Sequence, residues 1–224
     1  MAKQVWIVAN WKSHKTIAEA LDWVNRVGPV LPRKDFLKVA VCPVFTDLEE
    51  VKKAVLVGNY PLLVGAQDLS PFPEGAYTGE EPAAILAGLA DLVILGHSER
   101  RQNFGETDQT VAEKVKQARL KQIEPLICLQ SENTPVPVGV KLVAYEPVFA
   151  IGSGHPDTPE NAGTVAGKLK EKNGGKLLVL YGGSVTPENA GSFLEEENLD
   201  GLLVGGASLD PRQFTEIVRT AAQI

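Results

Sequence analysis

A complete strand-to-helix unit is contained in LLVLYGGSVTPEN, residues 177–189. Its first part, Leu177–Leu180, is apolar at every position, which is typical of a parallel strand covered on both faces. Its last part places Thr186 at an N-cap, Pro187 at the first helical position and Glu188 in the first turn. A glycine pair separates the two parts. The stretch therefore predicts a buried strand, a turn and a helix.

The same unit recurs along the chain. Thr158 and Asp210 begin two further helix signals, each followed directly by proline. Apolar residues spaced by three or four positions predict helices between the strands, for example Val111, Val115 and Ala118, and the stripe that starts at Ile17. The eight apolar runs predicted as strands are Val5–Asn10, Val39–Cys42, Leu62–Ala66, Leu92–Leu95, Pro125–Leu129, Leu142–Tyr145, Leu177–Leu180 and Gly201–Val204.

Eight alternating units without a linker-like composition shift predict one α/β domain over residues 1–224, a (β/α)8 barrel. A doubly wound open sheet is the alternative that the same alternation permits. One unit departs from the pattern. Only about a dozen residues separate strands 5 and 6, with Pro135, Pro137 and Gly139 among them, so this crossover has no room for an ordinary helix.

Composition excludes several classes of protein. The 224 residues are 44% hydrophobic, and 22 Lys and Arg against 28 Asp and Glu give a net charge of −6. This is not the composition of a disordered chain, a disulfide scaffold or a general nucleic-acid binder. The two cysteines and three histidines have no zinc-site spacing. Without a signal peptide or a long apolar segment, we expect a soluble cytoplasmic protein with no membrane partner.

In a (β/α)8 barrel, chemistry is expected at the carboxyl ends of the strands. Lys12, His97 and Glu146 each follow a predicted strand there. Taken singly, Lys12 would more often be solvated and His97 structural, and Glu146 is as well explained by a salt bridge as by catalysis. Together they form a base, an electrophile and a counter-charge, as needed to move a proton beside a carbonyl.

Two glycine pairs end strands 7 and 8, Gly182-Gly183 and Gly205-Gly206. One pair alone would indicate a tight turn, but two pairs in these two loops favour a phosphate site. A lid is predicted at Pro147-Val148-Phe149-Ala150-Ile151-Gly152-Ser153-Gly154, which has an apolar tip between proline and glycine hinges.

These motifs, in this order, resemble those of the triosephosphate isomerase family across the whole chain. The resemblance is carried by Ala9-Asn10-Trp11-Lys12, Gly96-His97-Ser98-Glu99-Arg100-Arg101, Tyr145-Glu146-Pro147, Ile151-Gly152-Ser153-Gly154, Tyr181-Gly182-Gly183-Ser184 and Val204-Gly205-Gly206-Ala207. Phe149 and Ser153, where members often have Trp and Thr, depart from the pattern, as does Gln130 after Cys128-Leu129.

The resemblance implies an isomerase of glycolysis and gluconeogenesis that needs no cofactor or metal. It interconverts dihydroxyacetone phosphate and D-glyceraldehyde 3-phosphate through an enediolate. Glu146 would be the base, His97 would polarise the carbonyl, Lys12 and Asn10 would hold oxygens, and Glu99 would orient Lys12. Backbone N–H groups of four further residues would bind the phosphate, from Gly152, Ser184, Gly205 and Gly206.

The resemblance also implies a homodimer formed through the loop Gln67–Glu80. A second interface is predicted at the shortened crossover, where Val136, Val138 and Val140 would leave an apolar patch beside strands 5 and 6. We therefore expect a homotetramer, as in short members of the family. The alternative functions are a phosphosugar lyase or synthase that uses the same phosphate site, and a barrel without catalysis that serves as a scaffold.

Overall fold

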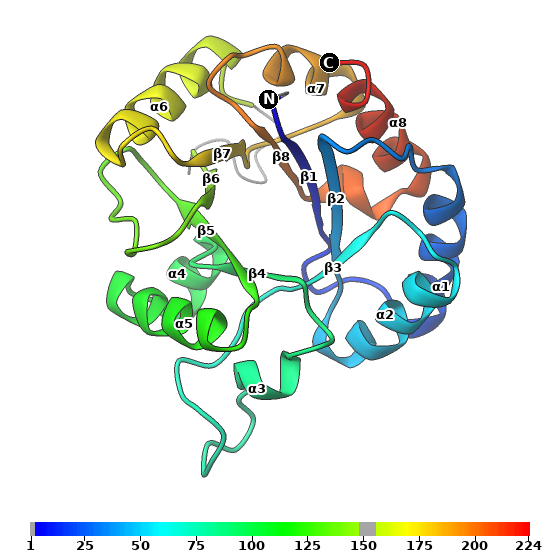
Figure 1. Ribbon diagram of the computed structural model, residues 1–224, viewed down its shortest axis with the longest axis vertical. Coiled ribbons are helices and arrows are strands. Elements are labelled where there is room, and N and C mark those ends of the chain that lie inside the picture. Colours follow the sequence, from blue (N-terminus) through cyan, green and yellow to red (C-terminus); the bar gives the residue numbers. More distant parts are fainter. Residues whose placement is uncertain (1–2, 148–155) are drawn as a thin grey trace.

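The computed structural model describes residues 3–147 and 156–224. Parallel strands form a closed barrel in which each strand pairs with the next and β8 pairs with β1 (Figure 1). The predicted (β/α)8 barrel is confirmed, and the open sheet is excluded because the ladder closes. The strands are β1 (Val5–Asn10), β2 (Leu37–Cys42), β3 (Leu63–Ala66), β4 (Leu92–Leu95), β5 (Glu124–Leu129), β6 (Leu142–Tyr145), β7 (Leu178–Tyr181) and β8 (Gly201–Val204).

Helices surround the barrel, as Figure 1 shows. The predicted caps are present: the side chains of Thr158 and Asp210 accept hydrogen bonds from the first turns of α6 and α8, and Thr186 forms a capping box with Asn189. The helices are α1 (Ile17–Val27), α2 (Leu48–Val57), α3 (Ala83–Leu86), α4 (Ser98–Phe104), α5 (Asp108–Leu120), α6 (Pro159–Lys172), α7 (Pro187–Leu194) and α8 (Pro211–Ala221), with 3-10 turns η1 (Gly28–Val30), η2 (Phe45–Asp47) and η4 (Gly206–Leu209).

The core has two layers. Alternate strand residues, such as Val8, Ile94 and Leu126, fill the inside of the barrel, and the intervening residues pack against the helices. Burial on both faces explains why the strands are continuously apolar in sequence. One prediction is wrong: Ile17 begins the expected core stripe of α1 but is 38% exposed, and Trp23 is buried on the core face instead.

The seam between the last and first strands depends on a glycine. Gly201 pairs with Trp6 and has a φ of +147°, a conformation that other residues rarely adopt. A Cβ atom at Gly201 would lie 1.9 Å from the backbone oxygen of Trp6, closer than any two such atoms can approach. Gly201 therefore lets β8 come close enough to β1 to close the barrel.

The connection between β5 and β6, residues 130–141, contains no helix. The shortened crossover is thus confirmed, and Figure 1 shows only coil between these strands. Two of the three valines expected to be exposed are not: Val140 is buried and Val136 packs against the core. Val138 alone is exposed, at 93%. The coil covers more of the barrel than we predicted because its alternate valines point inward.

A long loop between β3 and α3 extends away from the barrel (Figure 1). Its base is closed by a hydrogen bond from the backbone N–H of Ser70 to the carbonyl oxygen of Glu81. This loop contains the segment Gln67–Glu80. Among the described residues, no helix is long and apolar enough to cross a membrane.

Candidate active site

A cavity of about 480 Å³ opens at the carboxyl ends of the strands, a size suited to a small ligand. The structure brings together residues that are far apart in sequence. Asn10 ends β1 and Lys12 follows it, while His97 and Glu146 follow β4 and β6. The turns after β7 and β8 complete the lining with Gly182, Gly183, Ser184, Val185, Thr186, Gly205, Gly206 and Ala207.

Glu146 is a fully buried carboxylate at the end of β6. Its backbone N–H donates to the carbonyl oxygen of Leu129, which fixes the main chain. Oε2 accepts a hydrogen bond from the backbone N–H of Ser98 at 2.9 Å, and Oε1 lies 3.1 Å from His97 Nε2. The carboxylate is thus held by one backbone hydrogen bond on Oε2, and Oε1 faces the imidazole of His97.

His97 caps the start of α4. Its Nδ1 accepts a hydrogen bond from the backbone N–H of Glu99 at 3.3 Å, so the proton of the neutral ring lies on Nε2. The Glu99 carboxylate is also near Nδ1, at 3.7 Å, but it is engaged by Lys12. We assign the neutral tautomer from this network. Nε2 can then donate a hydrogen bond to a ligand oxygen in the cavity.

Lys12 is held in a strained backbone conformation, with a φ of 53°. Its N–H donates to Asn10 Oδ1 at 3.1 Å, and its carbonyl oxygen accepts a hydrogen bond from Gln67 Nε2 at 2.8 Å. Nζ pairs with Glu99 Oε1 at 2.5 Å. Backbone and side chain are thus both fixed, and an ammonium group faces the cavity that His97 and Glu146 line.

The residue before His97 is clamped on both sides. Gly96 has a φ of +70°, and a Cβ atom there would meet the Arg101 side chain at 2.9 Å. Its N–H donates to Glu106 Oε2 at 3.0 Å, and its carbonyl oxygen accepts a hydrogen bond from Arg101 Nε at 2.8 Å. These bonds fix the turn from β4 into α4 and so set the direction of the imidazole.

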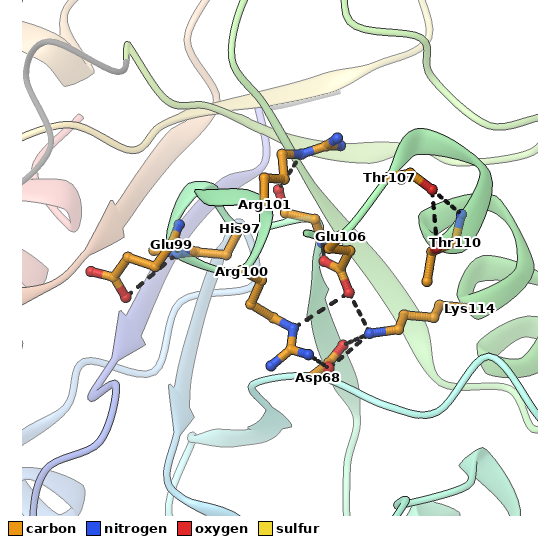
Figure 2. Close-up of polar contacts among 10 residues, drawn as sticks. Asp68, His97, Glu99, Arg100, Arg101, Glu106, Thr107, Thr110 and Lys114 are labelled. Atoms are coloured by element: carbon orange, nitrogen blue, oxygen red, sulfur yellow. Dashed lines mark hydrogen bonds and ion pairs between the residues drawn. The ribbon is translucent and has the colours of Figure 1, made fainter. Parts of the chain in front are cut away.

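Behind this turn lies a cluster of two acidic and two basic side chains, shown in Figure 2, of which Asp68, Glu106 and Lys114 are buried and Arg100 is partly exposed. Lys114 Nζ donates to Asp68 at 2.6 Å and also to Glu106, while Arg100 lies 2.8 Å from Asp68 and 3.4 Å from Glu106. Burial raises the pKa of Asp68, and the Lys114 ammonium opposes that rise. The cluster joins the base of the long loop to α4 and α5.

The sequence did not reveal Gln67, Asp68, Glu106 and Lys114, or the backbone contact of Ser98 with Glu146. One signal was available for Lys114, which lies within the core-facing stripe Val111, Val115 and Ala118. A lysine at such a position needs a buried partner. The sequence alone cannot name that partner, because Asp68 lies on a different strand-to-helix connection.

The predicted phosphate turns lie where the sequence placed them. Ser184, Gly205 and Gly206 line the cavity on the side of β7 and β8. Gly152 and the other lid residues, Val148–Gly154, lie outside the described residues, whereas Pro147 is within them. Among residues 3–147 and 156–224, no group of three His, Cys, Asp or Glu side chains could hold a metal ion.

Both cysteines are free and buried, as predicted. Burial raises the pKa of the Cys42 thiol, and burial next to Glu146 raises that of Cys128. Neither thiol is therefore activated for nucleophilic chemistry at neutral pH.

The triosephosphate isomerase family model matches residues 5–136 and 133–221. The two matches meet inside the connection 130–141, where this chain lacks a helix. A triosephosphate isomerase of Leifsonia xyli subsp. xyli is 40% identical, with 95% of each chain covered. That of Aquifex aeolicus is 36% identical over 95% of this chain and 97% of its own. That of Dehalococcoides mccartyi is 35% identical over 99% and 98%.

These matches cover nearly the whole chain and nearly the whole of each relative. The alignments run over more positions than this chain has residues, so the relatives contain segments that this chain lacks. The identity and coverage of these relatives, together with the closed eight-stranded barrel, assign the chain to one family. The chain belongs to the triosephosphate isomerase family.

Proposed function

We propose that this chain is an isomerase that interconverts dihydroxyacetone phosphate and D-glyceraldehyde 3-phosphate by proton transfer through an enediolate. One observation carries the proposal: the buried Glu146 carboxylate faces His97 Nε2 at 3.1 Å, beside the Lys12 ammonium. Base, hydrogen-bond donor and cation are the three groups that stabilise an enediolate. The family relationship supports the same reaction.

Each residue has a separate role in the proposed reaction. Glu146 removes a proton from one carbon and returns it to the neighbouring carbon. His97 donates from Nε2 to the carbonyl oxygen and moves protons between the two oxygens. Lys12 and Asn10 hold the oxygens, and Glu99 orients Lys12 through its 2.5 Å ion pair. The steps transfer protons only, so these side chains suffice without a metal or cofactor.

The phosphate would be bound by backbone N–H groups of Ser184, Gly205 and Gly206, which line the same cavity as Glu146. Gly152 would contribute from the proposed lid, Pro147–Gly154. Backbone donors suit a dianion in a protein of net charge −6, because they attract it without adding an ion that must be desolvated. Closure of the lid would keep water from the enediolate and prevent loss of phosphate.

A coupled assay tests the reaction. We expect turnover in both directions, unchanged by a metal chelator, with a dehydrogenase reporting each triose phosphate. The control is Glu146→Gln, which keeps the shape of the side chain but cannot accept a proton, and it should lose about 10²–10⁴-fold in rate. Absence of turnover in the wild type, or turnover that survives Glu146→Gln, contradicts the proposal.

We also propose that the chain acts as a homo-oligomer in the cytoplasm, in glycolysis and gluconeogenesis. The loop Gln67–Glu80 would reach a second copy near its active site, where Phe45 and Phe104 are exposed beside His97. Val138 and Leu120 are exposed around a groove of about 740 Å³ along α5, which supports a second interface and a tetramer. Two buried free thiols are compatible with a reducing compartment.

A further inference from the structure

The 3-10 turn η4, which follows β8, is held from behind by the segment that follows β1. Lys15 Nζ donates to the carbonyl oxygen of Leu209 at 2.9 Å. The indole Nε1 of Trp23 donates to the carbonyl oxygen of Ser208, also at 2.9 Å. Two successive carbonyl groups at the end of η4 are thus fixed by two side chains from one neighbouring segment.

The other end of the same turn faces the active site. Gly205, Gly206 and Ala207 line the cavity together with Lys12. Lys15 is not among the described residues that line this cavity, and its ammonium contacts the far end of the turn, at the Leu209 carbonyl oxygen. The segment after β1 therefore supplies Lys12 to the site and uses Lys15 to hold the neighbouring turn after β8.

Lys15 is held in an unfavourable backbone conformation, with a φ of 76°. Its Nζ also lies 5.3 Å from the centroid of the Trp11 ring, in a cation–π arrangement. Strain of this kind persists where surrounding contacts determine the position of the residue, and it is concentrated near functional sites.

We propose that Lys15 is a positioning residue that fixes η4 so that the N–H groups of Gly205 and Gly206 meet the substrate phosphate. This inference rests on the proposed isomerase function, and it adds to the site a residue, Lys15, that acts on the substrate only through η4. The physical reason is preorganisation: backbone donors bind an anion well only if they do not have to reorient when it arrives. Lys15 fixes the carbonyl end of the turn, which in turn fixes its N–H end.

Three variants separate this role from other roles of Lys15. Lys15→Met keeps most of the volume but loses the hydrogen bond to Leu209. Lys15→Gly loses the same bond and relieves the backbone strain. Lys15→Gln loses the charge but can still donate, so it separates a long-range effect of charge on the substrate from the hydrogen bond.

We expect KM for dihydroxyacetone phosphate and Ki for phosphoglycolate to rise about tenfold in Lys15→Met and Lys15→Gly, because the donors are misplaced by a fraction of the 1 Å that costs about 100-fold. Lys15→Arg should restore both constants to within about twofold. Lys15→Gln should lie nearer the wild type than Lys15→Met. The melting temperature of Lys15→Gly should not fall below that of Lys15→Met.

Gln122→Gly is the matched control for strain. Gln122 has a φ of 60° and precedes β5, so it lies at the opposite end of the barrel from the cavity. We expect this variant to change the melting temperature but neither KM nor Ki. Unchanged KM and Ki in both Lys15→Met and Lys15→Gly would overturn the proposal, as would an equal rise in Gln122→Gly.

Binding of inorganic phosphate, measured by calorimetry, provides a readout that does not need turnover. Its dissociation constant should rise in Lys15→Met and Lys15→Gly and remain unchanged in Gln122→Gly. If the wild type lacks isomerase activity but phosphate binding depends on Lys15, the proposed reaction fails and the role of Lys15 stands. If the wild type is active and phosphate binding does not depend on Lys15, the reaction stands and this role fails.

Discussion

Residues 96–120 and the connection 130–141 lie next to each other in the barrel and are built in opposite ways. The first segment contains two helices, a clamped Gly96, and three charged residues, Arg100, Glu106 and Lys114, that form a cluster with Asp68 of the long loop. The second is coil. Its main links to the neighbouring helices are hydrogen bonds from Arg119 of α5 to the Val138 carbonyl and from Lys172 of α6 to the Glu132 carbonyl.

The difference follows from what each segment positions. His97 and Ser98 must present one N–H group and one imidazole to Glu146, so the segment that contains them is fixed by many polar contacts. The connection presents no side chain to the cavity. It only has to cover two strands, and Val136 and Val140, each next to or near one of its two prolines, do so in part. Charged contacts thus fix the segment that must orient side chains of the site, whereas apolar contacts suffice for the segment that only covers strands.

The largest effect should come from removing the cation at the centre of the first segment. Lys114→Met leaves Asp68 and Glu106 buried with only Arg100 beside them. Loss of one partner of a buried ion pair costs about 3–5 kcal/mol in the free energy of unfolding. Urea unfolding at fixed protein concentration measures it, with the exposed Lys53→Met as a control that should change by less than about 0.5 kcal/mol. A loss below about 1 kcal/mol would show that the cluster does not stabilise the segment.

Glu146→Asp tests whether residues 96–120 fix the position of a carboxylate that comes after the connection 130–141. Glu146 directly follows β6, the strand that comes after the coil connection, yet its carboxylate accepts a hydrogen bond from the backbone N–H of Ser98. Shortening the side chain withdraws the carboxylate by roughly 1 Å, which costs about 100-fold in turnover. The affinity for phosphoglycolate should change much less, because the phosphate is bound by other residues. Near-normal turnover would remove Glu146 from the role of base.

Val138→Glu tests the proposed second interface at the connection. A charge at this exposed position would be buried without a partner between two copies, so a tetramer should dissociate into dimers. Light scattering after size exclusion measures the mass, and turnover per chain should stay within about twofold. Val57→Glu, at a valine that is 89% exposed on α2, is the control and should leave the mass unchanged. A wild type that is dimeric at all dilutions rules out this interface.

The smallest effect concerns how tightly β6 is held after the coil connection. Burial and the nearby Asp157 carboxylate raise the pKa of Tyr145 to about 12, and burial raises that of Tyr181 to about 12. An unfolded tyrosine titrates near pH 10. These groups therefore contribute stability that is complete below about pH 10 and is lost as the pH rises toward 12.

Absorbance of tyrosinate during an alkaline titration measures this effect. Two tyrosines should ionise near pH 12, and Tyr145→Phe should remove one of them and weaken the loss of stability between pH 10 and pH 12. A Tyr145 that ionises close to pH 10 would mean that the coil connection leaves β6 loosely packed. The looser construction of the connection 130–141 would then also affect the packing of β6.

Much of the fold could be predicted because a barrel strand is buried on both faces. Runs such as Leu142–Tyr145 can therefore be recognised as strands without knowing which strands they pair with, and local caps such as Thr158 mark where helices begin. The exposure of Ile17 could not be predicted, since it depends on where α1 lies against α8 and η4. The burial of Val136 and Val140 likewise depends on how the coil folds over β5 and β6.

The same distinction applies to the site. Asn10, Lys12, His97 and Glu146 could be found because strand ends converge by topology. The partners that hold them could not. Gln67 reaches Lys12 from the residue after β3, and Lys114 on α5 reaches Asp68 on the preceding strand-to-helix connection. Such contacts depend on the lengths and directions of side chains in the folded protein, which no local pattern of residues records.

The glycine that closes the barrel also has a consequence for the synthesis of the chain. Gly201 begins β8, so β1 has no partner on one edge until the 200 residues before Gly201 have been synthesised. Until then both β1 and β7 have open edges, which are templates for pairing with other chains. A product that ends before Gly201 contains every residue proposed to transfer protons, but it cannot close around them. Synthesis therefore yields an active protein only when its last strand is complete.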